Sequence, residues 1–107
     1  MYYDGLMRLL PEQVELIVAA SRELLGADAR VWLFGSRVRD DARGGDIDLL
    51  VEASRPVEQP VTLAAQLTAR LQRRLGDRRI DVLVTAADAA PEPIHRIARA
   101  EGVLLTP

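Results

Sequence analysis

Residues 33–36 read LFGS and residues 46–51 read DIDLLV, with nine residues between the two stretches. Side chains two apart on a β-strand point to the same face of the sheet. We therefore expect Asp46 and Asp48 to share one face at the start of a strand, while the apolar residues of the same run fill the other face. Two carboxylates at one rim of a sheet form a metal-binding geometry.

A third carboxylate, Asp81, lies near the start of another apolar run at residues 80–85. The segment between the two runs has leucines at four-residue spacing over residues 60–76, which predicts a helix long enough to connect two parallel strands. Parallel neighbours begin at the same rim of a sheet. The sequence therefore predicts that Asp81 lies beside Asp46 and Asp48.

The Gly35-Ser36 pair follows a strand predicted over residues 30–34, which ends at the same rim if it runs antiparallel to the second strand. Glycine lets the backbone approach a ligand closely, and the following amides with the Ser36 hydroxyl are suited to hold phosphate oxygens. Arg37 and Arg39 follow in the same loop, where guanidinium groups can neutralise a triphosphate. We expect these four residues to bind a nucleotide.

Three carboxylates in close contact repel one another and favour a bound cation. The chain has no lysine to offset them, and oxygen ligands without His or Cys favour magnesium, manganese or calcium over zinc. Each feature alone also has a structural interpretation, because a Gly-Ser pair after a strand commonly forms a turn and carboxylates at loop edges can cap backbone amides. The order and spacing of all the features together favour a catalytic site.

The rest of the chain predicts an α/β or α+β domain, with helices on a small mixed sheet. Helices are expected over residues 11–25, 60–75 and 93–101, and strands over residues 30–34, 47–52, 80–85 and 103–105. Proline at the first turn and glycine after the last turn delimit the first two helices. Trp32 and Phe34 alternate on the first strand, so we expect them in the core.

Length and composition limit the function classes. With 107 residues, the chain is expected to be a single domain, residues 1–107. The absence of cysteine and the presence of one histidine exclude disulfides and a His-rich zinc site. A net charge of −2 argues against nucleic-acid binding, and no apolar run approaches the roughly 20 residues of a membrane span. The first residues lack the pattern of a signal peptide, so a cytoplasmic protein is expected.

The stretch from Leu33 to Arg37, the nine-residue gap between Ser36 and Asp46, and the stretch from Asp46 to Val51 resemble the signature of the DNA polymerase beta-like nucleotidyltransferase superfamily. At this length the chain is similar to the minimal MNT-type members, and the resemblance covers about residues 11 to 105. It implies the palm-like nucleotidyltransferase fold. The gap loop is short for the family.

The resemblance also implies roles for the site residues. Asp46 and Asp48 would hold two magnesium ions, and Asp81 would complete the site and help to activate the acceptor hydroxyl. Gly35 and Ser36 would bind the triphosphate of ATP. Many minimal members are antitoxins paired with a HEPN ribonuclease toxin, and some transfer AMP to a tyrosine of that toxin.

Three functions follow from the resemblance. The favoured one is magnesium-dependent transfer of AMP from ATP to a hydroxyl, expected to be a tyrosine, of a partner HEPN toxin, as in a type VII-like antitoxin. The second is a binding module that neutralises the toxin by contact alone. The third is a nucleotidyltransferase for a small acceptor, which a short chain without an appended acceptor domain disfavours.

Overall fold

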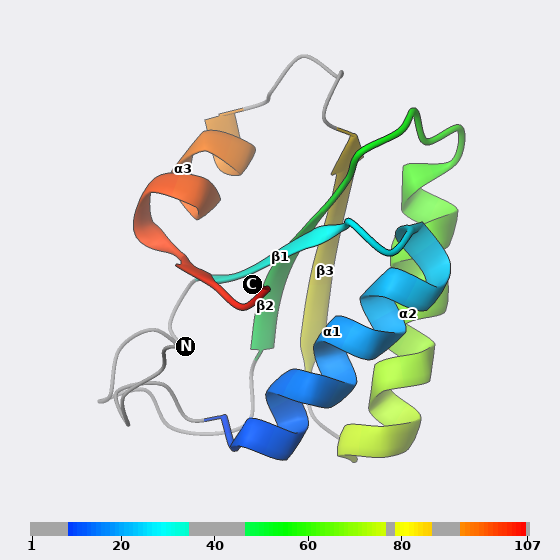
Figure 1. Cartoon of the computed structure of the whole chain (residues 1–107), viewed down its shortest axis with the longest axis vertical. Helices are drawn as coiled ribbons and strands as arrows, with labels where there is room; N and C mark the ends of the chain where they lie inside the picture. The colour runs from blue at the N-terminus through cyan, green and yellow to red at the C-terminus, as the bar shows by residue number, and fades with distance from the viewer. Residues whose placement is uncertain (1–8, 35–46, 77–78, 87–92, 107) are drawn as a thin grey trace.

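The computed structural model describes residues 9–34, 47–76, 79–86 and 93–106 (Figure 1). In chain order the elements are α1 (Pro11–Leu25), β1 (Arg30–Phe34), β2 (Ile47–Ala53), α2 (Pro60–Leu75), β3 (Ile80–Ala86), α3 (Pro93–Glu101) and β4 (Val103–Leu104). This order confirms the predicted one. β2 and β3 each extend one residue beyond the prediction, and β4 is one residue shorter, although the Leu105 amide still donates to the Val31 carbonyl at 2.7 Å.

The four strands form one mixed sheet in the order β3-β2-β1-β4. β2 and β3 are parallel, while β1 runs antiparallel to both β2 and β4. α2 connects the end of β2 to the start of β3, and parallel neighbouring strands require such a crossover connection. The mixed sheet and the crossover that the sequence predicts are both confirmed.

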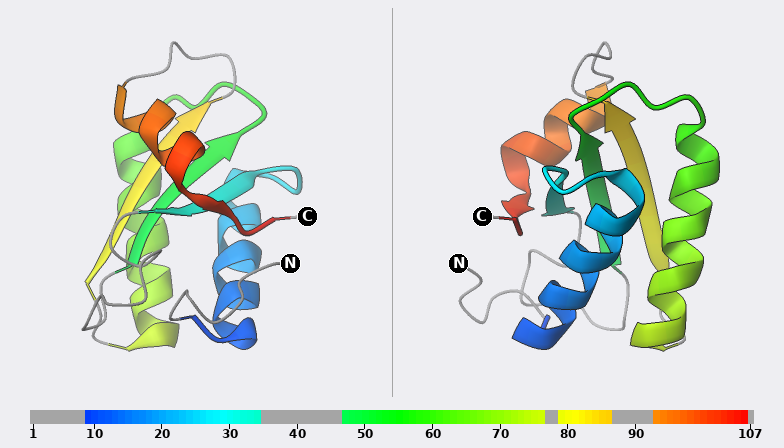
Figure 2. Two further views of the ribbon diagram at one scale, coloured as in Figure 1. Left: turned by 90° about the vertical axis from the view of Figure 1, so that its left-hand side faces the viewer. Right: turned by 45° about the vertical axis from the view of Figure 1, so that its right-hand side comes forward.

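The helices lie on both faces of the sheet. α1 and α2 lie side by side on one face, whereas α3 lies on the opposite side of the strands (Figures 1 and 2). An exposed ion pair between Arg70 and Glu23, 2.9 Å from Nη1 to Oε1, joins α2 to α1. No helix in the described part of the chain is long and apolar enough to cross a membrane.

The main core fills the space between the sheet and the helix pair α1/α2. The alternate residues Ile47, Leu49 and Val51 of β2 are fully buried in it, together with Leu67 and Leu71 of α2. Burial of each such side chain is worth about 1.5–3 kcal/mol. The two-residue alternation along β2 therefore determines which face of the sheet packs against α1 and α2.

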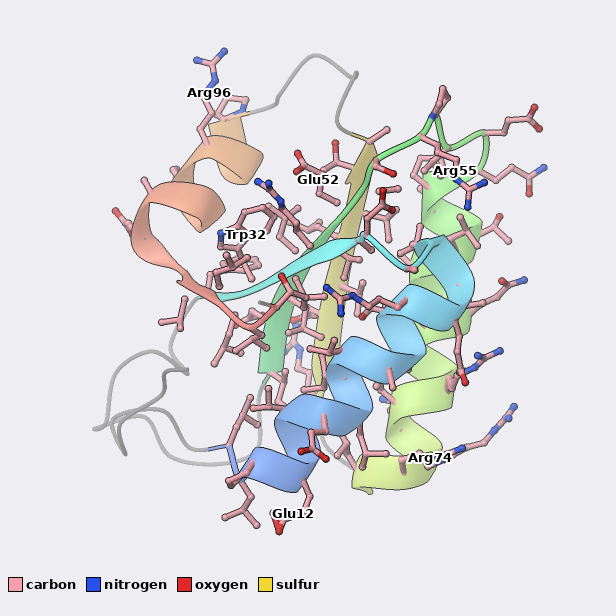
Figure 3. All side chains as sticks on the ribbon, viewed as in Figure 1. Glu12, Trp32, Glu52, Arg55, Arg74 and Arg96 are labelled. Carbon is pink, nitrogen blue, oxygen red and sulfur yellow. The ribbon has the colours of Figure 1, made fainter. Side chains whose placement is uncertain are left out.

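A smaller apolar cluster occupies the opposite face, on the side of α3. It contains Trp32 and Leu50, with the half-buried Phe34 and Leu83 packed against them. Trp32 is 9% exposed and lies on the α3 side of β1 (Figure 3). The prediction that Trp32 and Phe34 pack in the core is confirmed, but they belong to this second cluster rather than to the main core.

Local signals delimit the helices as predicted. Pro11 and Pro60 occupy the first turns of α1 and α2, where the missing N–H has no intrahelical acceptor. Gly26 and Gly76 follow the last residues with φ of 111° and 90°, a conformation that L side chains rarely adopt. At the start of α1, the Leu10 amide donates to the Gln13 side chain at 2.8 Å, which satisfies a backbone group outside the helix.

Candidate functional site

Three strand ends meet at one rim of the sheet. The register pairs Asp48 of β2 directly with Asp81 of β3, and it pairs Phe34, the last residue of β1, with Asp48. Neighbouring strands lie about 4.8 Å apart, and directly opposed residues point to the same face. The sequence-based prediction that Asp48 and Asp81 lie side by side is therefore confirmed.

The carboxylate pair belongs to the face of the sheet that carries the Trp32 cluster. Asp48 alternates with the buried Leu49 and lies on the same side as Leu50. Asp48 is half-buried, and the Asp81 side chain is 56% exposed. The main core under α1 and α2 thus fixes the strands, and the two carboxylates on the opposite face remain accessible to solvent.

Arg79 is a site residue that the sequence-based reasoning missed. Its Nε lies 3.4 Å from Asp81 Oδ2, and its side chain is 73% exposed. The Ile47 amide donates to the Arg79 carbonyl at 2.9 Å, which adds one hydrogen bond to the pairing of β2 and β3 just before β3 begins. The two-residue alternation that placed Asp46 with Asp48 also places Arg79 with Asp81, and this signal in the sequence could have identified it.

The presence of Arg79 corrects one element of the charge argument. The absence of lysine indicated that nothing offset the carboxylates, but an arginine two residues before Asp81 supplies the positive charge. An exposed pair of this kind is worth about 0–1 kcal/mol, so it offsets the charge of Asp81 without holding the side chain tightly.

The remaining predicted site residues lie outside the described residues. These are Asp46, Gly35, Ser36, Arg37 and Arg39. The structure describes the residues on either side of this segment, since β1 ends at Phe34 and β2 begins at Ile47. The predicted nucleotide-binding role of the four loop residues stays a prediction, as does the position of Asp46.

The two described carboxylates fit a divalent cation of the magnesium type. Such an ion is commonly held by one or two carboxylates, with water and substrate phosphates as its other ligands. Within residues 9–34, 47–76, 79–86 and 93–106, no three His, Cys, Asp or Glu side chains gather to hold a metal ion. The predicted set of three includes Asp46, so the described part of the chain contains two of its members together.

A cavity of about 440 Å³ lies at the other end of β2. Its lining includes Ala53, the last residue of β2, together with Arg55, Glu58 and Gln59 at the approach to α2. Figure 3 shows Arg55 near the beginning of α2 and Arg74 near its other end. Neither Asp48 nor Asp81 lines this cavity, so it lies away from the carboxylate pair, at the opposite end of the strands.

The comparison with known families identifies the domain. The model of the nucleotidyltransferase domain family matches residues 14–101, which include Asp48, Arg79 and Asp81. The comparison with curated proteins finds no match. A mixed sheet with two opposed carboxylates at the rim is consistent with the fold of that family. Because the match spans most of the 107 residues, the chain belongs to the nucleotidyltransferase domain family.

Proposed function

We propose that this nucleotidyltransferase domain transfers AMP from ATP to a hydroxyl group, a tyrosine, of a partner HEPN toxin, and thereby acts as a type VII-like antitoxin. The observation that carries the transfer chemistry is the direct opposition of Asp48 and Asp81 across the parallel pair β2/β3. Family membership supports nucleotidyl transfer in general. The choice of ATP, magnesium and a HEPN acceptor rests on the resemblance to the minimal MNT-type proteins.

In the proposed reaction, the acceptor oxygen forms a bond to the α-phosphorus of ATP. The bond from that phosphorus to the α–β bridging oxygen breaks, and pyrophosphate leaves. Asp48 and Asp81, with Asp46, would hold two magnesium ions, and an ion bound there supplies charge stabilisation for the departing pyrophosphate. The Asp81 carboxylate would orient the acceptor hydroxyl and accept its proton.

The exposure of the site supports an acceptor on another macromolecule. The Asp81 side chain is 56% exposed, and the cavity described above is at the far end of β2. A small acceptor held tightly is usually enclosed, with most of its surface buried by a pocket. A tyrosine presented by a folded partner needs no such enclosure, because the interface around it supplies the binding energy.

The test is transfer of label from α-³²P-ATP to a HEPN-domain protein taken from the neighbouring reading frame. Asp48→Asn and Asp81→Asn each preserve side-chain shape and should lower the rate on the order of 100-fold or more, because each removes charge that holds the metal. Glu58→Gln removes one negative charge from the far cavity and should transfer label at the wild-type rate. Equal activity of Asp48→Asn and wild type would disprove the proposed site.

The same proteins separate catalysis from neutralisation by contact. If the antitoxin acts by AMP transfer, the Asp48→Asn/Asp81→Asn double variant should bind the toxin yet fail to protect cells that express it. Protection by the folded double variant would show that contact alone neutralises the toxin. A neighbouring reading frame without a HEPN protein would contradict the antitoxin assignment and leave nucleotidyl transfer intact.

A further inference from the structure

The feature that points beyond the proposed function is the ion pair between Arg79 and Asp81. Arg79 directly precedes β3 and Asp81 is the second residue of that strand, with Arg79 Nε 3.4 Å from Asp81 Oδ2. The backbone of Arg79 is held in place, because its carbonyl accepts the Ile47 amide at 2.9 Å. The side chain is 73% exposed, so the guanidinium is free to leave the carboxylate while its backbone stays fixed.

The ion pair between Arg79 and Asp81 is weak enough for a cation to replace the guanidinium at Asp81. Coupling within an exposed ion pair changes an equilibrium by less than about fivefold. A divalent cation at the same carboxylate carries twice the charge of the guanidinium and takes carboxylate oxygen as a direct ligand. Asp81 can therefore be held by Arg79 or by a cation, and the weaker ion pair yields to the metal.

The charge of Arg79 makes the ion pair with Asp81 and the binding of a cation to Asp81 compete. Arginine side chains are cations in proteins, so the guanidinium brings a fixed positive charge to Asp81. A guanidinium that contacts Asp81 repels a divalent cation approaching the same oxygen atoms. The opposed carboxylate, Asp48, is half-buried. Water therefore screens only in part the repulsion between the guanidinium and a cation bound at this carboxylate pair.

We infer that Arg79 is a positioning residue that serves as the counterion of Asp81 in the metal-free chain and competes with a divalent cation for that carboxylate. It thereby lowers the affinity of this carboxylate for a divalent cation. The inference rests on the proposed metal-binding role of Asp81. It implies that any group that binds the Arg79 guanidinium, and so draws it away from Asp81, raises the affinity of the site for metal.

The test is a titration of the full chain with Mn²⁺, which takes the same oxygen ligands as Mg²⁺, monitored by the EPR signal of the free ion. At low ionic strength, Arg79→Gln should bind Mn²⁺ about threefold more tightly than wild type, and the difference should shrink in high salt. Arg79→Lys retains the charge and should bind within about twofold of wild type. Arg55→Gln removes the same charge at the far end of β2 and should leave the affinity unchanged.

The Asp81→Asn background completes the test as a double-mutant cycle. In the Asp81→Asn background, Arg79→Gln should change the residual Mn²⁺ affinity by less than it changes the affinity of the wild-type site. If Arg79→Gln binds Mn²⁺ no more tightly than wild type while Asp81→Asn weakens or abolishes binding, the inference is overturned and the proposed metal site stands. If Asp81→Asn binds Mn²⁺ as wild type does, or if wild type and Arg79→Gln both fail to bind it, the metal-binding role of Asp81 is overturned and the inference with it.

Discussion

Asp48 of β2 and Asp81 of β3 are directly opposed in the parallel ladder, although 32 residues lie between them in the sequence. The opposition depends on α2, which returns the chain to the end of the sheet where β2 began. Each strand contributes one carboxylate at its second position. The site is therefore a product of the crossover, and a shift of β3 by one residue would turn Asp81 to the opposite face.

Bound metal should stabilise the fold through the carboxylate pair. At a free Mg²⁺ or Mn²⁺ concentration about ten times the dissociation constant, binding adds about 1.4 kcal/mol to the free energy of unfolding. For a domain of this size that corresponds to a rise in Tm of roughly 6–11 °C, measurable by calorimetry. Asp48→Asn and Asp81→Asn should lose this rise, whereas Glu58→Gln should keep it. A rise that persists in Asp81→Asn would place the stabilising metal elsewhere.

Truncation of the β2 core row should destabilise the protein strongly. Leu49 is fully buried against the helix pair, so Leu49→Ala should lower the free energy of unfolding by about 2–5 kcal/mol, through lost burial and the cavity left behind. Val61→Ala provides the contrast, since Val61 on α2 is 82% exposed and should change stability by less than about 0.5 kcal/mol. Urea unfolding monitored by circular dichroism measures both. Equal stabilities would contradict the burial assigned to β2.

The end of α2 should depend on the backbone of Gly76 rather than on space around it. Gly76 has φ of 90° and ψ of −167°, and an added Cβ would meet nothing within 4 Å. Gly76→Ala should therefore cost about 1–3 kcal/mol from backbone strain alone. Thermal unfolding measures this cost. A variant as stable as wild type would show that the chain after α2 readily adopts another conformation.

Most elements of the fold could be predicted from local patterns. The helix from Pro11 to Leu25 and the helix from Pro60 to Leu75 follow from apolar spacing between a proline and a glycine. The predicted positions of the strand ends were less accurate. β4 is shorter than predicted, although the Leu105 amide continues the hydrogen bonding to β1. Strand ends depend on the partners across the sheet, and these partners are distant in sequence.

The site was predicted in part. The alternation along β2 correctly indicated that Asp48 faces away from the core, and the proposed crossover correctly brought Asp81 beside it. Arg79 was not predicted, because the absence of lysine indicated no neutralising cation, whereas an arginine directly before β3 supplies one. The roles of Gly35, Ser36, Arg37, Arg39 and Asp46 stay predictions, since these residues lie outside the described part of the chain.

Local chemistry along the chain was sufficient to identify the helices, the strands and the apolar face of β2, because propensity and periodicity act within a few residues. The pairing of Asp48 with Asp81 needed a specific strand order and register, which join residues distant in sequence and depend on packing against both faces of the sheet. The contact between Arg79 and Asp81 likewise depends on side-chain conformation at an exposed rim. Residue types therefore indicated the chemistry, and the tertiary structure determined which charges meet.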